Sequence, residues 1–235
     1  MKQQEYTNTP NDVLFKIMKN GRRREENAAM KELRERFYSL SQEEQTQLIL
    51  HYLGREKMHR KWAYRYLLDI WDERYAPVVE ALWNEYHEEK CAWSIIRHFP
   101  LSFVKEHREE LSIGSNRPFV ERRLCEDETY EIDESKLTPY ECAWVYSVTG
   151  RKMSDEKAIQ LLVDNVRRAC ETKTIIRYNS IENFSIDMYK IIYHLEKMGK
   201  YDVTYRFRSW FEPIIDNVSN YMLQYLQKAE VDLHR

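Results

Sequence analysis

Residues 75–99 read YAPVVEALWNEYHEEKCAWSIIRHF, and their apolar side chains recur at the spacing of two successive amphipathic helices. The first stripe consists of Tyr75, Val78, Val79, Leu82, Trp83 and Tyr86. The second stripe consists of Ala92, Ile95, Ile96 and Phe99. Because each stripe must be buried against another apolar face, the stretch predicts two short helices joined by a tight turn.

The same periodicity extends in both directions along the chain of 235 residues. Thr9-Pro10 and Thr138-Pro139 each place a capping hydroxyl before a proline at the first helical position. Helices are predicted at residues 10–20, 22–38, 41–53, 57–72, 75–86, 88–98, 100–111, 139–149, 155–171, 184–198, 201–211 and 213–231. The sequence therefore predicts an all-α fold of about 11–12 helices, arranged as antiparallel pairs in an α-solenoid or a bundle.

Glycine and proline are scarce, with 5 Gly and 6 Pro in the chain. No two glycines share a short loop, which excludes GxGxxG, the phosphate-binding P-loop and the GxSxG nucleophile elbow. Many-turned β-sandwiches and barrels are also disfavoured. Gly21, Gly54, Gly150 and Gly199 follow predicted helices, where we expect left-handed residues to end them.

Residues 112–137 interrupt the helical pattern. Six acids gather there, namely Glu126, Asp127, Glu128, Glu131, Asp133 and Glu134. Residues 119–120 and 130–132 could form short strands. We therefore expect an N-terminal helical lobe over 1–112, an irregular acidic connector over 113–137 and a C-terminal helical lobe over 138–235, with one continuous domain as the alternative.

The charge balance and the cysteine spacing limit the classes of protein to which the chain can belong. Lys and Arg number 37 against 39 Asp and Glu, so no strong field draws the whole chain to nucleic acid or to an anionic membrane. No apolar run is long enough for a transmembrane helix. Cysteines 91, 125, 142 and 170 form no CxxC pair, which is typical of reduced thiols in a cytoplasmic protein. We expect no metal site and no cofactor.

A weak internal repeat suggests a family. Lys61-Trp62-Ala63-Tyr64 matches Lys90-Cys91-Ala92-Trp93, and Cys142-Ala143-Trp144 repeats part of it, with a small alanine beside a large aromatic residue each time. The stretch from Asp72 to Leu82 resembles the turn and second helix of a HEAT-type repeat, a resemblance that covers residues 57–111. It implies a stack of helix pairs that binds a partner along one surface, and it implies no catalytic residue.

Chemically reactive side chains are few. His87 and Cys91 are spaced like two zinc ligands on one helix, but no second pair completes a site, and a core Cys91 with a boundary His87 is the simpler interpretation. Asp69, Asp72 and Glu73 could form an acid–base group, or they could simply surround a turn. The pattern favours a protein that is not an enzyme, although an enzyme without a sequence signature stays an alternative.

The leading hypothesis is therefore a helical protein that binds another protein as an adaptor or inhibitor. Aromatic residues are favoured at interfaces, and acids can dock a basic partner. The candidate residues are Trp62, Trp71, Trp83, Glu126, Asp127 and Glu128.

The second hypothesis is a nucleic-acid-binding HEAT-like protein of the DNA-alkylation-repair type. Its candidate residues are Arg22, Arg23, Arg24, Arg206 and Arg208. The Trp-Asp-x-x-Asp type of signature that this resemblance would require is missing, because the only Trp-Asp pair, Trp71-Asp72, continues Glu-Arg-Tyr. Acidic residues also neutralise the first arginine cluster along its helix.

Overall fold

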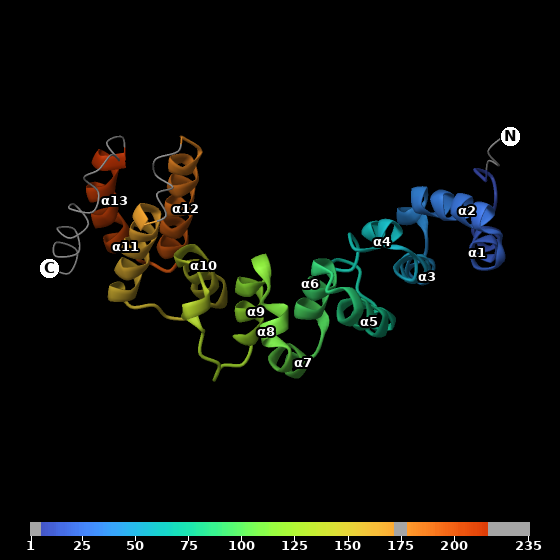
Figure 1. The fold of residues 1–235 in the computed structure, drawn as a ribbon, viewed down its shortest axis with the longest axis horizontal. Coiled ribbons are helices and arrows are strands. Elements are labelled where there is room, and N and C mark those ends of the chain that lie inside the picture. Colours follow the sequence, from blue (N-terminus) through green and yellow to red (C-terminus); the bar gives the residue numbers. More distant parts are fainter. Residues whose placement is uncertain (1–5, 172–177, 216–235) are drawn as a thin grey trace. The chain divides into compact units, whose positions relative to one another are not determined.

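The structure is a computed structural model that describes residues 6–171 and 178–215. Within these residues every regular element is helical and none is a strand, which confirms the predicted all-α fold (Figure 1). The short strands predicted at 119–120 and 130–132 are wrong. Among the residues described, no helix combines the length and the apolar character that crossing a bilayer requires.

The chain divides into two compact units, residues 1–99 and residues 100–235. The division falls between Phe99 and Pro100, whereas the sequence placed the end of the first lobe at residue 112. Residues 113–137, expected as a connector between lobes, belong with the second unit.

Unit 1 consists of consecutive helices that pack as neighbours. They are α1 (Asn11–Asn20), α2 (Arg23–Glu35), the 3-10 turn η1 (Phe37–Ser39), α3 (Gln42–Leu53), α4 (Lys57–Ala63), the 3-10 turn η2 (Glu73–Tyr75), α5 (Ala76–Tyr86) and α6 (Glu89–His98). Contacts join α1 with α2, α3 with α4 and α5 with α6, so the predicted helix pairing holds within this unit (Figure 1).

Helix α4 is shorter than the predicted helix at 57–72. The α-helix ends at Ala63, and the chain then tightens into turns, with Arg65 N–H donating to the Trp62 carbonyl at 3.3 Å and Tyr66 N–H to the Ala63 carbonyl at 2.9 Å. These bonds span three residues instead of four, which is the 3-10 pattern. In these turns the centroids of the Trp62 and Tyr66 rings lie 5.0 Å apart. The two aromatic side chains therefore pack together just where the regular helix ends.

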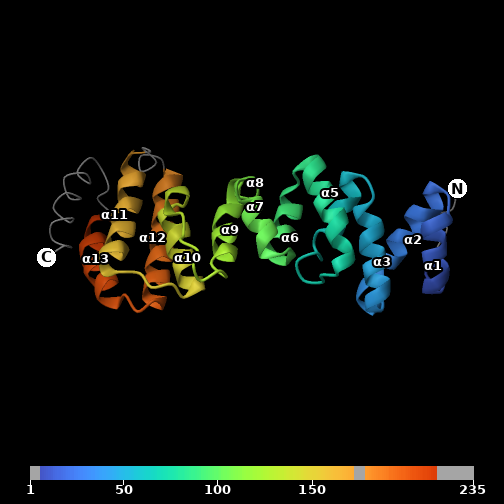
Figure 2. The same cartoon turned by 90° about the horizontal axis from the view of Figure 1, so that it is seen from below.

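Unit 2 begins with short helices and ends with longer ones. They are α7 (Leu101–Glu106), α8 (Arg108–Leu111), η3 (Gly114–Asn116), α9 (Arg117–Leu124), η4 (Glu134–Lys136), α10 (Pro139–Thr149), α11 (Asp155–Glu171), α12 (Tyr178–Lys197) and α13 (Tyr201–Ile215). Helices α11, α12 and α13 run beside one another and α10 packs on α11 and α12, in a small bundle (Figures 1 and 2).

The bundle encloses a continuous apolar core with contributions from α10 to α13, including Ala143, Leu162, Ile191 and Phe207. Helices at 139–149 and 155–171 agree with the sequence prediction to the residue. The helix predicted to begin at 184 begins at Tyr178 instead. Helix α13 continues through Pro213 to Ile215, and the remainder of the helix predicted at 213–231 lies outside the described residues.

The expected irregular segment contains a helix that the sequence pattern did not reveal. Pro118 stands in the first turn of α9, where a missing N–H leaves no bond unmade. Val120 and Leu124 are buried from the same helix, and so is Glu121. Because the inner face includes the charged residue Glu121, the sequence of α9 lacks a continuous apolar stripe, and helical periodicity does not predict the helix.

Candidate functional site

The predicted interface residue Trp62 is the centre of an aromatic cluster in unit 1. Its ring lies 4.4 Å from the ring of Tyr52 and meets the ring of Phe37 edge-on at 5.2 Å. Phe37 and Tyr52 are buried, whereas Trp62 is half-buried. One side of the indole is therefore held by the core while part of it still reaches the surface.

Two large apolar side chains beside this cluster are exposed. Tyr38 is 84 % exposed, and its ring touches the rings of Phe37 and Tyr66 at centroid distances of 5.5 and 6.3 Å. Met58, one helical turn before Trp62 on α4, is 80 % exposed. We call Tyr38, Met58 and Trp62, with the hollow described next, the Trp62 surface.

The hollow lies between α2, α3 and α4 and has a volume of about 250 Å³. Trp62, Met58 and Tyr52 line one part of it, and Tyr52 donates its hydroxyl to the Met30 carbonyl at 3.2 Å across its base. A second group of lining residues is basic: Lys31, Arg34 and His59. The surface therefore combines adaptable apolar side chains with positive charge at one edge.

Helix α4 also carries a buried ion pair on its inner face. Arg60 donates to the carboxylate of Glu88 at 2.7 Å, and the Tyr64 hydroxyl donates to the other oxygen of the same carboxylate. Burial alone would raise the pKa of Glu88, but the hydrogen bonds from Tyr64 and Arg60 outweigh it and hold the pKa below its ordinary value. Glu88 is therefore ionised, and it ties α4 to the start of α6.

The other two predicted tryptophans are engaged inside unit 1. Trp83 is only 3 % exposed and belongs to the core, so it does not contribute to a surface. Trp71 stacks face to face on His98 at 4.5 Å and donates its indole N–H to Glu73 at 3.1 Å. Trp62 and Trp71 are thus both half-buried, and Trp62 is the one that lies beside the exposed side chains of Tyr38 and Met58.

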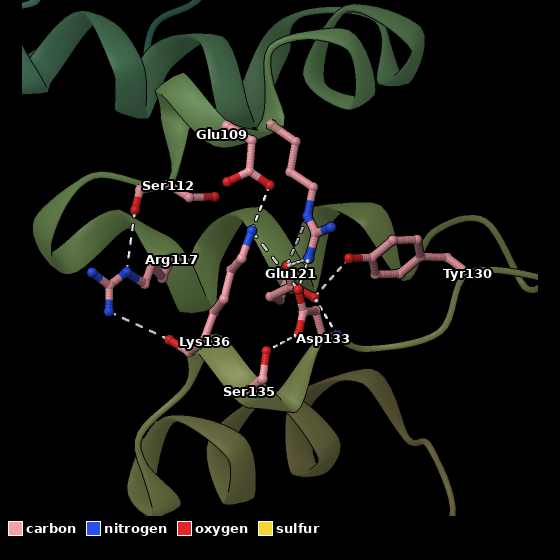
Figure 3. A network of polar contacts seen from close by, with 9 residues as sticks. Glu109, Ser112, Arg117, Glu121, Tyr130, Asp133, Ser135 and Lys136 are labelled. Atoms are coloured by element: carbon pink, nitrogen blue, oxygen red, sulfur yellow. Dashed lines mark hydrogen bonds and ion pairs between the residues drawn. The ribbon is translucent and has the colours of Figure 1, made fainter.

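The acidic segment of unit 2 is folded around a buried carboxylate, as Figure 3 shows. Glu121 is 2 % exposed, and one of its oxygens accepts from Arg108 at 2.7 and 3.2 Å. The other oxygen accepts from the Tyr130 hydroxyl at 2.8 Å and from the Asp133 backbone N–H at 3.1 Å. Arg108 also reaches the Asp133 carboxylate at 3.2 Å, so this network fixes the segment against α8 and α9.

The three acids predicted to bind a partner differ in their surroundings. Asp127 forms an ion pair with Lys105, whose ammonium holds the pKa of Asp127 well below its usual range. Glu126 pairs with Arg123, and Glu128 is exposed. Two of the three carboxylates thus have cationic partners within unit 2, which leaves less free charge for docking than the sequence indicates.

The arginines of the nucleic-acid hypothesis are Arg22, Arg23, Arg24, Arg206 and Arg208. The first three lie in unit 1 and the last two in unit 2. Arg23 pairs with Glu56 at 2.8 Å, and Arg208 pairs with Glu196 at 3.1 Å. Ion pairs inside each unit therefore neutralise part of this charge.

The possible zinc ligands are not brought together. His87 is exposed at the end of α5, whereas Cys91 is buried in α6, and burial raises the pKa of its thiol to about 11. Within residues 6–171 and 178–215, no three metal-ligating side chains gather in one place. The side chain of Cys170 lies outside the described part of the chain. Asp72 caps η2 by accepting from the Arg74 N–H at 3.0 Å, as a turn residue does.

Sequence reasoning missed Tyr38 and Met58. A signal for Met58 existed, because Met58, Trp62 and Tyr66 recur every four residues and therefore share one side of the chain. Tyr38 offered none, since its position depends on the 3-10 turn η1 that follows α2. In comparisons with known proteins, no protein-family model, no curated protein and no solved structure matches this chain.

Proposed function

We propose that the protein binds another protein and that the Trp62 surface is its docking element. The observation that carries this proposal is the exposure of Tyr38 and Met58 beside a half-buried tryptophan at a hollow. Aromatic and methionine side chains are enriched in the centres of protein interfaces, and a pocket beside them accepts an anchoring residue of the partner.

The basic edge of the hollow determines what kind of segment fits. Arg34 is exposed on α2, next to Lys31, which makes only a long ion pair of 3.9 Å with Glu35. A partner segment with an apolar anchor followed by acidic residues would satisfy both the hollow and this edge. The proposed partner is therefore a protein segment of mixed apolar and acidic character.

As the wider context of this function we propose a HEAT-like adaptor in the cytoplasm, and the pairing of helices supports the HEAT-like architecture. Neighbouring helices of unit 1 pack as consecutive pairs, and the alanines of the repeated motif, Ala63, Ala92 and Ala143, are all buried. A small residue at these positions permits close helix approach, as a repeat architecture requires. The proposal assigns no catalytic residue.

The test compares two double variants of the full chain as bait for proteins from the native source. Tyr38→Ser/Met58→Ser alters the Trp62 surface and leaves the core alone, because both side chains are exposed. Tyr201→Ser/Tyr205→Ser is the matched control, since these tyrosines are 64 % and 74 % exposed on α13. Captured proteins are quantified by mass spectrometry.

We expect a stoichiometric partner on the wild-type and control baits, reduced about tenfold on the Tyr38→Ser/Met58→Ser bait, which corresponds to about 1.4 kcal/mol of binding energy. Retention of the same partner by that bait would show that another surface binds it. Failure of the wild-type bait to capture any stoichiometric partner over several conditions would remove the proposed function itself.

A further inference from the structure

A second concavity in unit 1 shares no lining residue with the Trp62 surface. It is a cleft of about 610 Å³ bounded by α4, by the turns after α4 and by the junction of α5 with α6. The apolar part of its lining, called the floor below, consists of Tyr64, Leu68 and the half-exposed ring of Tyr86. The guanidinium of Arg60 lies 4.9 Å from the centroid of the Tyr86 ring and so supports it from one side.

Four cations line the cleft together with this apolar floor. Lys57, Lys61 and Arg65 follow one another at four-residue intervals, and Lys90 lines the cleft from α6, where its ammonium lies 3.6 Å from the centroid of the Trp93 ring. Lys57 and Lys61 have this spacing within α4, where like charges destabilise a helix, so this pair costs folding stability. Lys61 and Arg65 have no ion-pair partner among the described residues.

The acids that line the cleft do not balance these cations. Glu88 already receives hydrogen bonds from Arg60 and Tyr64, so its negative charge is compensated by these two partners. Glu89 is the other carboxylate of the lining. Four cationic side chains and two carboxylates line the cleft, so its net positive charge makes it attractive to an anion, and low-dielectric walls strengthen that attraction.

Backbone strain occurs at the same place. His87 lines the cleft with φ 48° and ψ 39°, and it is the one non-glycine residue with positive φ in the described part of the chain. Strained residues persist where the surrounding structure determines their conformation, and they cluster at ligand sites. Here the left-handed residue ends α5 and turns the chain directly into α6, which brings Lys90 to the cleft.

We propose that this cleft binds a small organic phosphate, with the phosphate among the four cations and a flat apolar body on the Tyr86 floor. Lysine ammonium groups suit a phosphate dianion because they act as compact point charges and can each donate to a separate oxygen. The aromatic floor suits a ring better than an alkyl chain, because stacked rings gain from offset packing. The proposal is independent of the Trp62 surface.

The experiment is calorimetric titration of the full-length protein at low ionic strength with five probes. Phenyl phosphate and adenosine monophosphate carry both the phosphate and a flat body, and they separate a simple aryl source from a nucleotide source. Inorganic phosphate and glycerol 3-phosphate lack the flat body, and phenol lacks the phosphate. We expect at least one of the first two to bind about tenfold more tightly than any of the other three.

Three variants locate the binding. Lys61→Ala/Arg65→Ala is expected to weaken the tighter probe about tenfold and to reduce the salt dependence of binding. Tyr86→Ala is expected to abolish the preference of that probe over inorganic phosphate. Lys152→Ala, an exposed lysine of unit 2, is the control and leaves binding unchanged. Circular dichroism melting shows that each variant is folded.

The proposal is overturned if neither phenyl phosphate nor adenosine monophosphate binds below about 10 mM. It is also overturned if Lys61→Ala/Arg65→Ala binds like the folded wild type, because the anion would then lie elsewhere. Equal affinity for phenyl phosphate, adenosine monophosphate and inorganic phosphate would refute the role of the aromatic floor. None of these outcomes affects capture of a protein by the Trp62 surface.

Discussion

At the scale of the single residue, the left-handed conformation of His87 is the feature that the sequence concealed. The residue ends α5, and its N–H donates to the Trp83 carbonyl at 2.8 Å. Helices usually end this way on glycine, because other residues pay for the contact between Cβ and the backbone. The glycine pattern was informative at Gly150 and Gly199, which have φ of 68° and 79°.

The same pattern was wrong at two other helix ends. Gly21 and Gly54 have φ of −72° and −73°, so neither is left-handed. At Gly21 the requirement is space, because a Cβ there would lie 2.5 Å from the Ile17 carbonyl oxygen. A glycine after a helix therefore predicts the helix end well and its conformation less well.

His87 gives a direct measurement of left-handed strain. We expect His87→Gly to be more stable than His87→Ala by about 1 kcal/mol, because both variants lose the imidazole and only alanine retains a Cβ in the left-handed region. Urea unfolding at equilibrium measures the difference between them.

The matched control is Glu85, an exposed residue in the last turn of α5 with an ordinary helical conformation. At Glu85 we expect the opposite order of stability, with the glycine variant less stable than the alanine variant by up to about 1 kcal/mol. If glycine is the less stable substitution at both positions, the conformation of His87 is not strained.

At the scale of the element, α9 shows why part of the fold could be predicted and part could not. Helices α10 and α11 have capped starts, and α11 also has a regular apolar stripe, so their bounds follow from local chemistry. In α9 the inner face includes Glu121, whose burial is possible only because Arg108 and Tyr130 supply hydrogen bonds. Those partners lie outside α9, so no pattern within the helix predicts that Glu121 is buried.

The candidate sites also include some features that the sequence could predict and others that it could not. Aromatic enrichment selected Trp62, Trp71 and Trp83 together, and the burial of Trp83 depends on which helices cover α5. Nothing in the sequence distinguishes Lys61 and Arg65, and their common cleft with Lys90 depends on the turn at His87 between α5 and α6. Spacing predicts which residues share a helix face, but it does not predict which faces meet.

The buried carboxylate of α9 supports an element-scale prediction. Glu121→Gln places an amide donor against groups that already donate, namely Arg108, the Tyr130 hydroxyl and the Asp133 N–H. We expect the free energy of unfolding to fall by about 3 kcal/mol, the range found when one member of a buried pair is removed. Hydrogen exchange should locate the loss of protection in α8, α9 and residues 130–136.

Glu128→Gln is the control, because this acid of the same segment is exposed. It should change the free energy of unfolding by less than about 0.5 kcal/mol. Similar effects of the two substitutions would mean that the network around Glu121 does not hold the acidic segment in place.

At the scale of the whole molecule, the division of the chain into two compact units leads us to expect separate apolar cores. Leu48 in α3 is fully buried in unit 1, and Leu162 in α11 is fully buried in the bundle of unit 2. The break between Phe99 and Pro100 resembles any other helix end in the sequence, so composition directed attention to the acidic segment instead. The division depends on which long-range contacts form, and these contacts cannot be predicted from a single sequence.

Separate cores predict separate responses to a cavity. Leu48→Ala should lower the stability of unit 1 by about 2–5 kcal/mol, because it removes buried methyl groups and leaves a void. Amide exchange should then speed up in α2 and α3, while protection in α10 to α12 stays at its wild-type level. Leu162→Ala should give the reverse pattern, with loss of protection confined to unit 2. If either substitution speeds exchange equally in both sets of helices, the two units unfold as one cooperative body, and the division between residues 99 and 100 has no energetic meaning.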